Sequence, residues 1–537
     1  MLHHRAPGGA RFRRPGMLLL SALIAALVPV TLGPVPAGAV ASPTAGSGDW
    51  TVYHGDPTGN GVDASGGSYG TTAAWTSPSL DGQLYGQPLV SGGRVYVATE
   101  DDTVVALDAS NGRTAWLTHL GTAVPASDLP CGDIQPTVGV TGTPVLDPSR
   151  GELFVVADEL VHGAPGHLLV GLDASTGSVE LTQTVDPPGA DPAALLQRTG
   201  LALDSGRIVF GFGGNYGDCG AYHGWVVSVP EAGGAPLRFE VDAGSGQREG
   251  AVWMGGAAPV VGNDGNVWVS VGNGSVVTSS GPYDNSDSVL ELSPSLALLQ
   301  YFAPARWAAD NAADLDLSVA PALLDDGLVV AAGKSQTAYL LQGTRLAGIG
   351  GQLASLATGC GDDLDGGVAF AGSIVYLPCV RGPIAVQVST APPGLREVWR
   401  ATVGGGPPIV AGGRVWTVGS DGFLYGLDPT TGQVLQRAQL GIPANHFPTP
   451  GIGDGLLLAA SADQVVAFPS STTSSPASSL PAVSTTRPVE GHEATVSTQS
   501  GIPVGAIAAV AAGGLLVVGA AVWLVTRRRR RGGPPAS

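Results

Sequence analysis

The sequence predicts an all-β protein, an eight-bladed β-propeller over residues 49–468. Composition is the first observation: 13% of the 537 residues are charged, whereas 82 are Gly and 42 are Pro, which is too turn-rich for a helical protein. The second is a repeated hairpin, clearest at 412–432 and again at 92–112. The third is the presence of eight copies at spacings of 41 to 62 residues, a period that favours propeller blades.

The hairpin at 412–432 joins two β-prone runs by a tight turn. Val415 lies in the first run, Phe423 lies in the second, and Asp421-Gly422 is the turn dipeptide between them. In each copy a Gly is expected to open the inner strand of a blade. These glycines are Gly93, Gly151, Gly206, Gly265, Gly327, Gly372, Gly413 and Gly455.

The last copy ends at Phe468 without an outer strand. The β-prone residues at 50–53 and Trp75 precede the first copy, so we expect them to supply the missing strands. Joining both ends of the chain closes the ring and removes the exposed sheet edges that promote aggregation. A solenoid of the same repeats is the alternative architecture.

The N-terminal residues 1–41 have the pattern of a signal peptide. Four arginines precede the apolar run at 17–30, and small residues that suit a cleavage site follow it. We therefore expect the chain to be exported.

The C-terminal residues predict a membrane anchor. Residues 502–526 are apolar and long enough to cross a bilayer as a helix, and the arginines of the tail at 527–537 mark the cytoplasmic side. The Pro/Ser/Thr-rich segment 469–501 is expected to be a stalk. These features predict a single-pass cell-membrane protein with an extracellular propeller and a cytoplasmic C-terminus.

Charge and cysteine content limit the partners and the compartment. The formal net charge is −18, and an acidic surface repels phosphate backbones, so no nucleic-acid partner is expected. Four cysteines in an exported chain favour two disulfides, since no pair has the close spacing of zinc sites. Three connectivities are possible, and we expect Cys131 with Cys219 and Cys360 with Cys379.

The repeats resemble those of the pyrroloquinoline quinone (PQQ) propeller superfamily, which includes quinoprotein alcohol dehydrogenases and the propeller lipoprotein of outer-membrane protein assembly. The resemblance rests on the hairpin, on the Leu-Asp-x-x-Thr-Gly exit at 427–432 and on a following Trp, here Trp116 and Trp399. It covers nearly all of residues 50–468. The resemblance implies that these tryptophans lock neighbouring blades together.

Three loops depart from the repeat, at 213–224, at 253–285 and from 310 to Lys334, and the sequence places any functional site between Cys131 and Lys334. From the residues alone, Asp314 and Asp316 offer two carboxylates to a hard cation such as calcium. Asp and Asn are also the usual turn residues of β-proteins. Both interpretations of these loops remain open.

The resemblance to quinoprotein dehydrogenases implies a role for each matching residue. The matches are Trp253 as the platform under the quinone, Asn273, Asp316 and Asp218 as metal ligands, Asp314 as the catalytic base, and Lys334 as the contact to the quinone oxygens. The chain departs from the family where a glutamate ligand is expected, because only Cys219 or Asp218 is available, and Ala313 replaces the Trp before the catalytic Asp. Trp253 could equally be an inter-blade packing residue and Lys334 a solvated one.

Two functions follow from the sequence. The first is a non-catalytic binding or scaffold module that takes a protein, peptide or glycan ligand, which is favoured by the incomplete metal-ligand set and the stalked anchor. The alternative is a dehydrogenase that uses PQQ and calcium to oxidise an alcohol or a sugar, which is favoured by the ordered match of Trp253, Asn273, Asp314 and Lys334.

Overall fold

The computed structural model describes residues 48–471 apart from residues 66, 245, 362 and 443–444. The predicted signal peptide, the transmembrane segment, the basic tail and all but the first three residues of the predicted stalk lie outside the described residues. Within the described part, no helix is both long and apolar enough to span a membrane.

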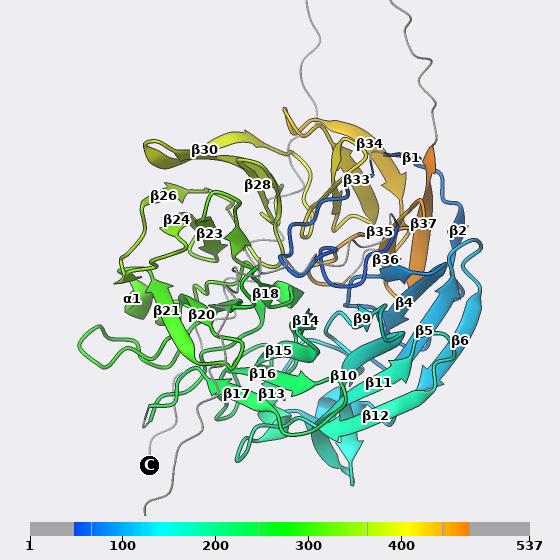
Figure 1. Cartoon of the computed structure of the whole chain (residues 1–537), viewed down its shortest axis with the longest axis horizontal. Coiled ribbons are helices and arrows are strands. Elements are labelled where there is room, and N and C mark those ends of the chain that lie inside the picture. Colours follow the sequence, from blue (N-terminus) through cyan, green and yellow to red (C-terminus); the bar gives the residue numbers. More distant parts are fainter. Residues whose placement is uncertain (1–47, 66, 245, 362, 443–444, 472–537) are drawn as a thin grey trace, which may run out of the picture. The chain divides into compact units, whose positions relative to one another are not determined.

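The described residues form eight antiparallel sheets arranged as blades around a central axis (Figure 1). The blades, with strands given from the axis outward, are: β3 (Leu89–Ser91), β4 (Arg94–Ala98), β5 (Thr103–Asp108) and β6 (Thr114–His119); β9 (Val145–Asp147), β10 (Glu152–Val161), β11 (Ala164–Asp173) and β12 (Val179–Thr184); β14 (Ala202–Asp204), β15 (Arg207–Gly214), β16 (Trp225–Pro230) and β17 (Leu237–Glu240); β18 (Val260–Val261), β19 (Val267–Val271), β20 (Ser288–Leu292) and β21 (Leu298–Ala303); β22 (Ala322–Leu323), β23 (Leu328–Gly333), β24 (Thr337–Gln342) and β26 (Ala354–Ala357); β27 (Ala369–Ala371), β28 (Ile374–Leu377), β29 (Ile384–Thr390) and β30 (Pro393–Arg400); β31 (Ile409–Ala411), β32 (Arg414–Val418), β33 (Phe423–Leu427) and β34 (Val434–Gln439); and β35 (Gly451–Gly453), β36 (Leu456–Ser461) and β37 (Gln464–Ser471) with β1 (Ser68–Tyr69) and β2 (Trp75–Thr76).

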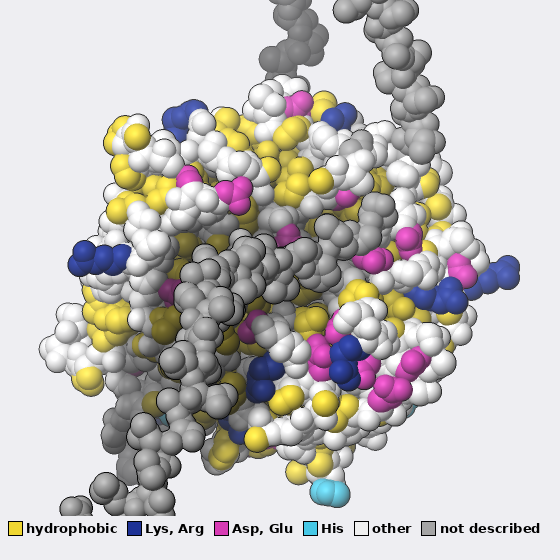
Figure 2. All heavy atoms as spheres, in the orientation of Figure 1, with side chains coloured by type: hydrophobic (Ala, Val, Ile, Leu, Met, Phe, Trp, Pro, Cys, Tyr) yellow, Lys and Arg dark blue, Asp and Glu magenta, His cyan; other side chains and the backbone are white. Residues whose placement is uncertain are grey.

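Short elements lie between or beside the blades. They are β7 (Val124–Pro125), β8 (Thr137–Val138), β13 (Leu195–Leu196), β25 (Gly348–Ile349), the helix α1 (Trp307–Asn311), and the 3₁₀ turns at Ala126–Asp128, Pro192–Ala194 and Met254–Gly256. Figure 2 shows Lys and Arg side chains scattered over one face of the described residues, with Asp and Glu side chains between them.

The predicted eight-bladed architecture is confirmed, with one correction to the strand order. Each of the eight predicted runs forms a strand, but that strand is the second from the axis. The innermost strand is a shorter one of two or three residues, such as β3, which precedes the expected Gly and pairs with β4. Gly93 has a φ of +77°, a left-handed conformation that suits Gly in the tight turn between these two strands.

The N-terminal strands complete the last blade, as predicted for Trp75. In β2, Trp75 lies opposite Ala467 of β37, and in β1, Ser68 lies opposite Ser471. The run at 50–53 does not join this blade, because Trp50 pairs instead with Val90 of the first blade. The prediction for that run was wrong, since β propensity indicates an extended backbone without identifying its partner.

Residues 48–63, here named the axial segment, connect most of the blades at one end of the axis. The segment is part of the dark blue trace near the centre of Figure 1. Its backbone forms hydrogen bonds with six of the eight blades. Trp50 exchanges two bonds with Val90 (2.7 and 2.9 Å). The other bonds run from a blade N–H to a carbonyl oxygen of the segment: Leu146 to Thr51 (2.8 Å), Val261 to Pro57 (2.8 Å), Phe370 to Asn60 (2.9 Å), Val410 to Gly61 (2.7 Å) and Asp454 to Gly48 (3.0 Å). No motif in residues 48–63 predicts this role.

Tryptophans lock neighbouring blades together, as the resemblance implied. The indole N–H of Trp399 donates to the carbonyl oxygen of Pro429 in the next blade (2.8 Å). Gly432 ends the same exit motif, and a Cβ there would lie 2.4 Å from the Trp399 ring. Equivalent contacts join Trp75 to Ala109 and Gly112, and Trp116 to Ala174 and Gly177. The exit Gly therefore leaves room for the indole of the preceding blade.

Replacing Gly432 by Ala should destabilise the propeller more than replacing Gly413 by Ala. Both glycines have φ near +70°, so each substitution costs about 1–2 kcal/mol of backbone strain. Only the Cβ at 432 meets Trp399, whereas position 413 has no atom within 4 Å. Overpacking should cost Gly432→Ala roughly a further 1–3 kcal/mol, measured by urea unfolding. Equal losses for the two variants would contradict the locking role of Trp399.

Candidate functional site

A cavity of roughly 830 Å³ lies around the axis, formed by loops that lead into the innermost strands and by loops that follow the second strands of the blades. The axial segment bonds innermost-strand residues that pair with the beginnings of those second strands, such as Val90 opposite Val95. The segment and the cavity mouth therefore lie toward opposite ends of the axis. The phenolic oxygen of Tyr53, on the axial segment, accepts from the Gly367 N–H (3.1 Å) and bonds the Thr449 hydroxyl (3.1 Å).

All six residues that the sequence assigned to cofactor or metal chemistry line this one cavity. They are Asp218, Trp253, Asn273, Asp314, Asp316 and Lys334. The cavity also takes residues from later blades, among them Asp365, His446 and Phe447. The expectation that a site lies wholly between Cys131 and Lys334 was therefore wrong, because loops from blades around the ring meet at a propeller axis.

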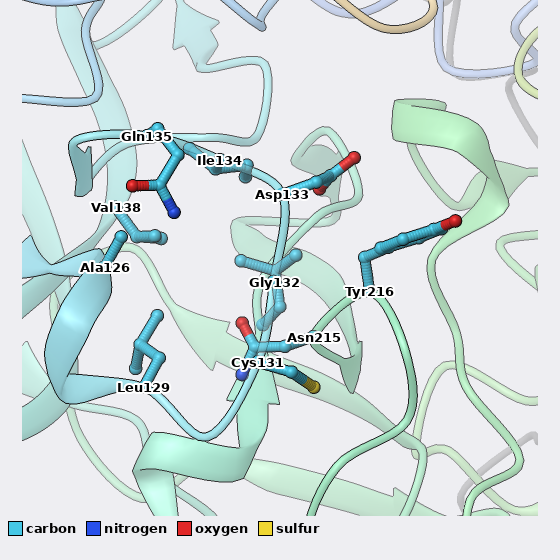
Figure 3. A pocket seen from close by; sticks show the side chains of 11 residues that line it. Ala126, Leu129, Cys131, Gly132, Asp133, Ile134, Gln135, Val138, Asn215 and Tyr216 are labelled. Atoms are coloured by element: carbon cyan, nitrogen blue, oxygen red, sulfur yellow. The ribbon is translucent and has the colours of Figure 1, made fainter. Parts of the chain in front are cut away.

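Both predicted disulfides form, Cys131 with Cys219 and Cys360 with Cys379. The first joins a loop that carries Asp133 to a loop that carries Tyr216. Figure 3 shows both side chains extending to the same side of a small pocket that they line together with Ala126 and Leu129. Asp133 and Tyr216 also line the large cavity, so this disulfide ties together two parts of its wall.

Lys334 forms ion pairs with both predicted aspartates. Its Nζ lies 2.7 Å from Asp316 Oδ2 and 3.2 Å from Asp314 Oδ1. The other oxygen of Asp316 accepts the backbone N–H of Asn273 (2.6 Å). Burial alone would lower the pKa of Lys334, but the charge and hydrogen bond of Asp316, with the charge of Asp314, raise it above its usual range. Lys334 is therefore a permanent cation at this position.

The donor set does not fit a calcium ion. Calcium takes six to eight oxygen ligands, whereas both aspartates are bonded to Lys334 and Asp218 accepts from the Tyr222 hydroxyl (2.5 Å). Within the described ranges, no three His, Cys, Asp or Glu side chains are placed to hold a metal. The Lys334 ammonium supplies the positive charge that a metal would supply between these carboxylates.

Cationic and aromatic side chains form a continuous row in the cavity wall, here named the cation–aromatic row. Lys334 Nζ lies 5.2 Å from the centre of the Trp253 ring, and this ring lies 5.7 Å from that of Phe447. The guanidinium of Arg198 lies 5.8 Å from the Phe447 ring and 5.5 Å from the Tyr85 ring. Trp253 thus lines the cavity and also packs against a buried hydrophobic cluster. No motif in the sequence predicts that Phe447, Arg198 and Tyr85 lie here.

Asp365 is a buried carboxyl in the same cavity. It is 2% exposed, and its Oδ1 has no hydrogen-bond partner among the described residues. Burial raises the pKa of Asp365 to about 7, against the smaller lowering effects of Ser318 and Lys334. Near neutral pH this carboxyl therefore changes between a protonated form, which can donate a hydrogen bond, and an ionised form, which can only accept hydrogen bonds.

Comparison with known proteins identifies the family. A family model described as outer membrane protein assembly factor BamB matches residues 40–281 and 306–477. The chain belongs to this family. The predicted membership of the PQQ-like propeller superfamily is thereby confirmed. No curated protein matches the chain significantly.

Solved structures share the fold of this BamB-family chain. A quinohemoprotein alcohol dehydrogenase from Pseudomonas putida HK5 is 15% identical, with a TM-score of 0.60, over 79% of this chain and 80% of that chain. The corresponding enzyme from Comamonas testosteroni is 15% identical (TM-score 0.58; 78% and 80%). A europium-containing methanol dehydrogenase is 15% identical (TM-score 0.55; 77% and 89%). At this level of identity, the similarity shows the fold.

The variant Asp365→Asn should gain stability relative to the natural BamB-family chain as the pH rises. The raised pKa means that folded Asp365 keeps its proton where the unfolded chain has lost it, so the natural chain loses unfolding free energy between about pH 4 and pH 7. Asn does not titrate. Chemical unfolding at pH 5 and pH 8 should show a relative gain of up to about 3 kcal/mol. Parallel pH profiles for the two proteins would contradict this assignment.

The variant Lys334→Met should be far less stable than Asp314→Asn. Removing the ammonium leaves Asp316, whose side chain is 3% exposed, as a buried charge without its ion pair, at a cost of about 3 kcal/mol. Asp314 is 63% exposed, so its loss should cost less than about 1 kcal/mol. Urea unfolding at pH 7 measures both losses. A smaller loss for Lys334→Met would show that its ion pairs do not stabilise the cavity wall.

Proposed function

We propose that the chain is a membrane-anchored extracellular propeller that binds a ligand in its axial cavity and catalyses no reaction. The anchor is the apolar segment 502–526 with the arginines that follow it. The ligand belongs to the classes that the sequence favoured: a peptide, a glycan or a segment of another protein. The family match to an assembly factor supports a role in binding.

One observation carries the proposal: the side chains of the cavity are arranged to bind and not to hold a metal. Lys334 neutralises Asp314 and Asp316. The residue assigned to catalysis and one residue assigned to metal binding are therefore both paired with the same lysine. The aromatic faces of the cation–aromatic row offer contact area for a ligand. The exposed ring of Tyr216 adds a platform to the cavity lining.

A second candidate is a PQQ-dependent dehydrogenase that oxidises an alcohol or a sugar. The observation that favours it is the meeting of Trp253, Asn273, Asp314 and Lys334 in one cavity. The dehydrogenases that share the fold support it as well. The ion pairs of Lys334 argue against it, because they occupy the carboxylates that the metal would need.

Ligand binding should depend on the lining of the cavity. The full-length protein in detergent micelles is screened by thermal shift against peptide and glycan collections, and each hit is repeated with two variants. Tyr216→Ala removes a ring that is 74% exposed in the cavity lining, whereas Leu117→Ala removes an apolar side chain that is 54% exposed on the outer strand β6. Hits should weaken about 10-fold with Tyr216→Ala, since an aromatic platform contributes on the order of 1–2 kcal/mol, and remain unchanged with Leu117→Ala. The reverse pattern would place binding outside the cavity.

The dehydrogenase is tested by reconstitution. The same preparation is titrated with PQQ and calcium, and dye-linked oxidation of alcohols and sugars is measured. We expect no turnover above that of the free cofactor. Turnover that Asp314→Asn abolishes would overturn the non-catalytic proposal.

A further inference from the structure

We infer that Arg198 anchors the carboxylate of a small organic monoanion in the axial cavity, and this inference rests on the proposed function because the ligand occupies the same site. Arg198 lies between β13 and β14. It lines the cavity and is 7% exposed. No motif singled it out in the sequence.

The guanidinium of Arg198 lacks the partner that a buried charge normally has. Its only hydrogen bond among the described residues runs from Nη2 to the carbonyl oxygen of His446 (3.1 Å), so most of its five N–H donors stay unused. Within the described part of the chain, no carboxylate lies within ion-pair distance of it. A buried charge without a counterion is costly. An anion supplied by a ligand would remove this cost.

The acidic neighbours of Arg198 make their hydrogen bonds to other groups, and the second oxygen of Glu100, Oε1, has no partner among the described residues. Glu100 accepts from the Gly139 N–H (2.9 Å) and the Thr141 hydroxyl (3.0 Å), and burial raises its pKa to about 7. Asp133 pairs with the imidazole of His446 (3.2 Å). These carboxyls moderate the positive potential around Arg198 without forming an ion pair with it.

The surroundings of Arg198 suit a flat anion. The Tyr85 and Phe447 rings lie 5.5 and 5.8 Å from the guanidinium carbon, and such contacts stabilise a cation while its N–H edge stays free. Gly256 leaves room for the guanidinium itself, because a Cβ there would lie 2.3 Å from Arg198 Nη1. A planar carboxylate can accept two parallel N–H bonds from the edge of a guanidinium.

The charge balance of the cavity favours a monoanion over a phosphate. Lys334 is paired to two aspartates, so Arg198 is the permanent cation in the described lining that has no carboxylate partner. A dianion would retain one uncompensated charge near Asp133, Asp218 and Asp365, which also line the cavity. Phe447 and Trp253 would then contact an apolar or aromatic body attached to the carboxylate.

The test uses benzoate as the probe and benzamide and phenylphosphonate as its neutral and dianionic analogues. Binding to the full-length protein in detergent micelles is measured by calorimetry and by thermal shift at about pH 8.5, where benzoate carries one charge and phenylphosphonate carries two. Benzoate should bind and raise the melting temperature, and both analogues should bind at least 10-fold more weakly. Stronger binding of phenylphosphonate would overturn the assignment to a monoanion.

Variants locate the anchor. Arg198→Gln should weaken benzoate at least 10-fold, whereas Arg198→Lys should retain part of the affinity. Arg207, on β15 of the same blade, donates to Ser228 Oγ (2.8 Å) and its carbonyl (2.7 Å), so Arg207→Gln is the matched control and should bind benzoate normally. Without benzoate, Arg198→Gln should unfold at or above the natural temperature, because it removes an unpaired buried charge. A large loss of stability in Arg198→Gln would indicate a structural role instead.

The outcomes separate this inference from the proposed function. If ligands that depend on Tyr216 bind but benzoate does not, or if Arg198→Gln leaves benzoate affinity unchanged, the carboxylate anchor is wrong and the binding function stands. If no ligand depends on Tyr216 but benzoate binding depends on Arg198, the anchor stands and the peptide or glycan class is wrong. If benzoate fails and no hit depends on the cavity, both are wrong.

Discussion

The cavity depends on the backbone hydrogen bonds of the axial segment. A ring of eight blades leaves an opening along its axis, and a chain of 16 residues crossing one end converts that opening into a space closed on one side. Because the bonds use backbone groups of the innermost strands or, at Asp454, of the turn next to one, they depend little on side-chain identity. They bring blades one, two, four, six, seven and eight into contact with a common element, so the loops of the cavity are held by a shared support.

Two permanent cations define the electrostatics of the cavity, and their environments differ. Lys334 is surrounded by carboxylates and is compensated within the protein. Arg198 lies beside the Tyr85 and Phe447 rings and donates to one carbonyl oxygen, and no carboxylate among the described residues forms an ion pair with it. A site that compensates one cation internally and leaves the other for a ligand is selective for charge number as well as sign. The inferred anion would therefore depend on Arg198, because the rest of the described lining is rich in carboxylates.

The fold could be predicted from the sequence because the repeat constrains it eight times. The contact of Trp399 with Gly432 was readable because a blade-locking tryptophan and an exit Gly recur. The pairing of Trp50 with Val90 could not be predicted from the sequence, because it depends on the tertiary arrangement of the blades. The members of the site that the resemblance supplied do meet in one cavity. The contribution of Arg198 and Phe447 to the cavity could not be predicted from the sequence, because both lie in loops outside the repeat. Their contacts also join positions about 250 residues apart in the chain.

The pairing of β2 with β37 also bears on the order in which the protein is made. Trp75 is synthesised early and its partner Ala467 late, so the last blade cannot assemble until almost the whole propeller has emerged. Until then β1 and β2 lack the strand they pair with, although the indole of Trp75 already contacts Ala109 and Gly112 of the first blade. A chain that ends before β37 would leave β1 and β2 without a partner strand and the last blade incomplete.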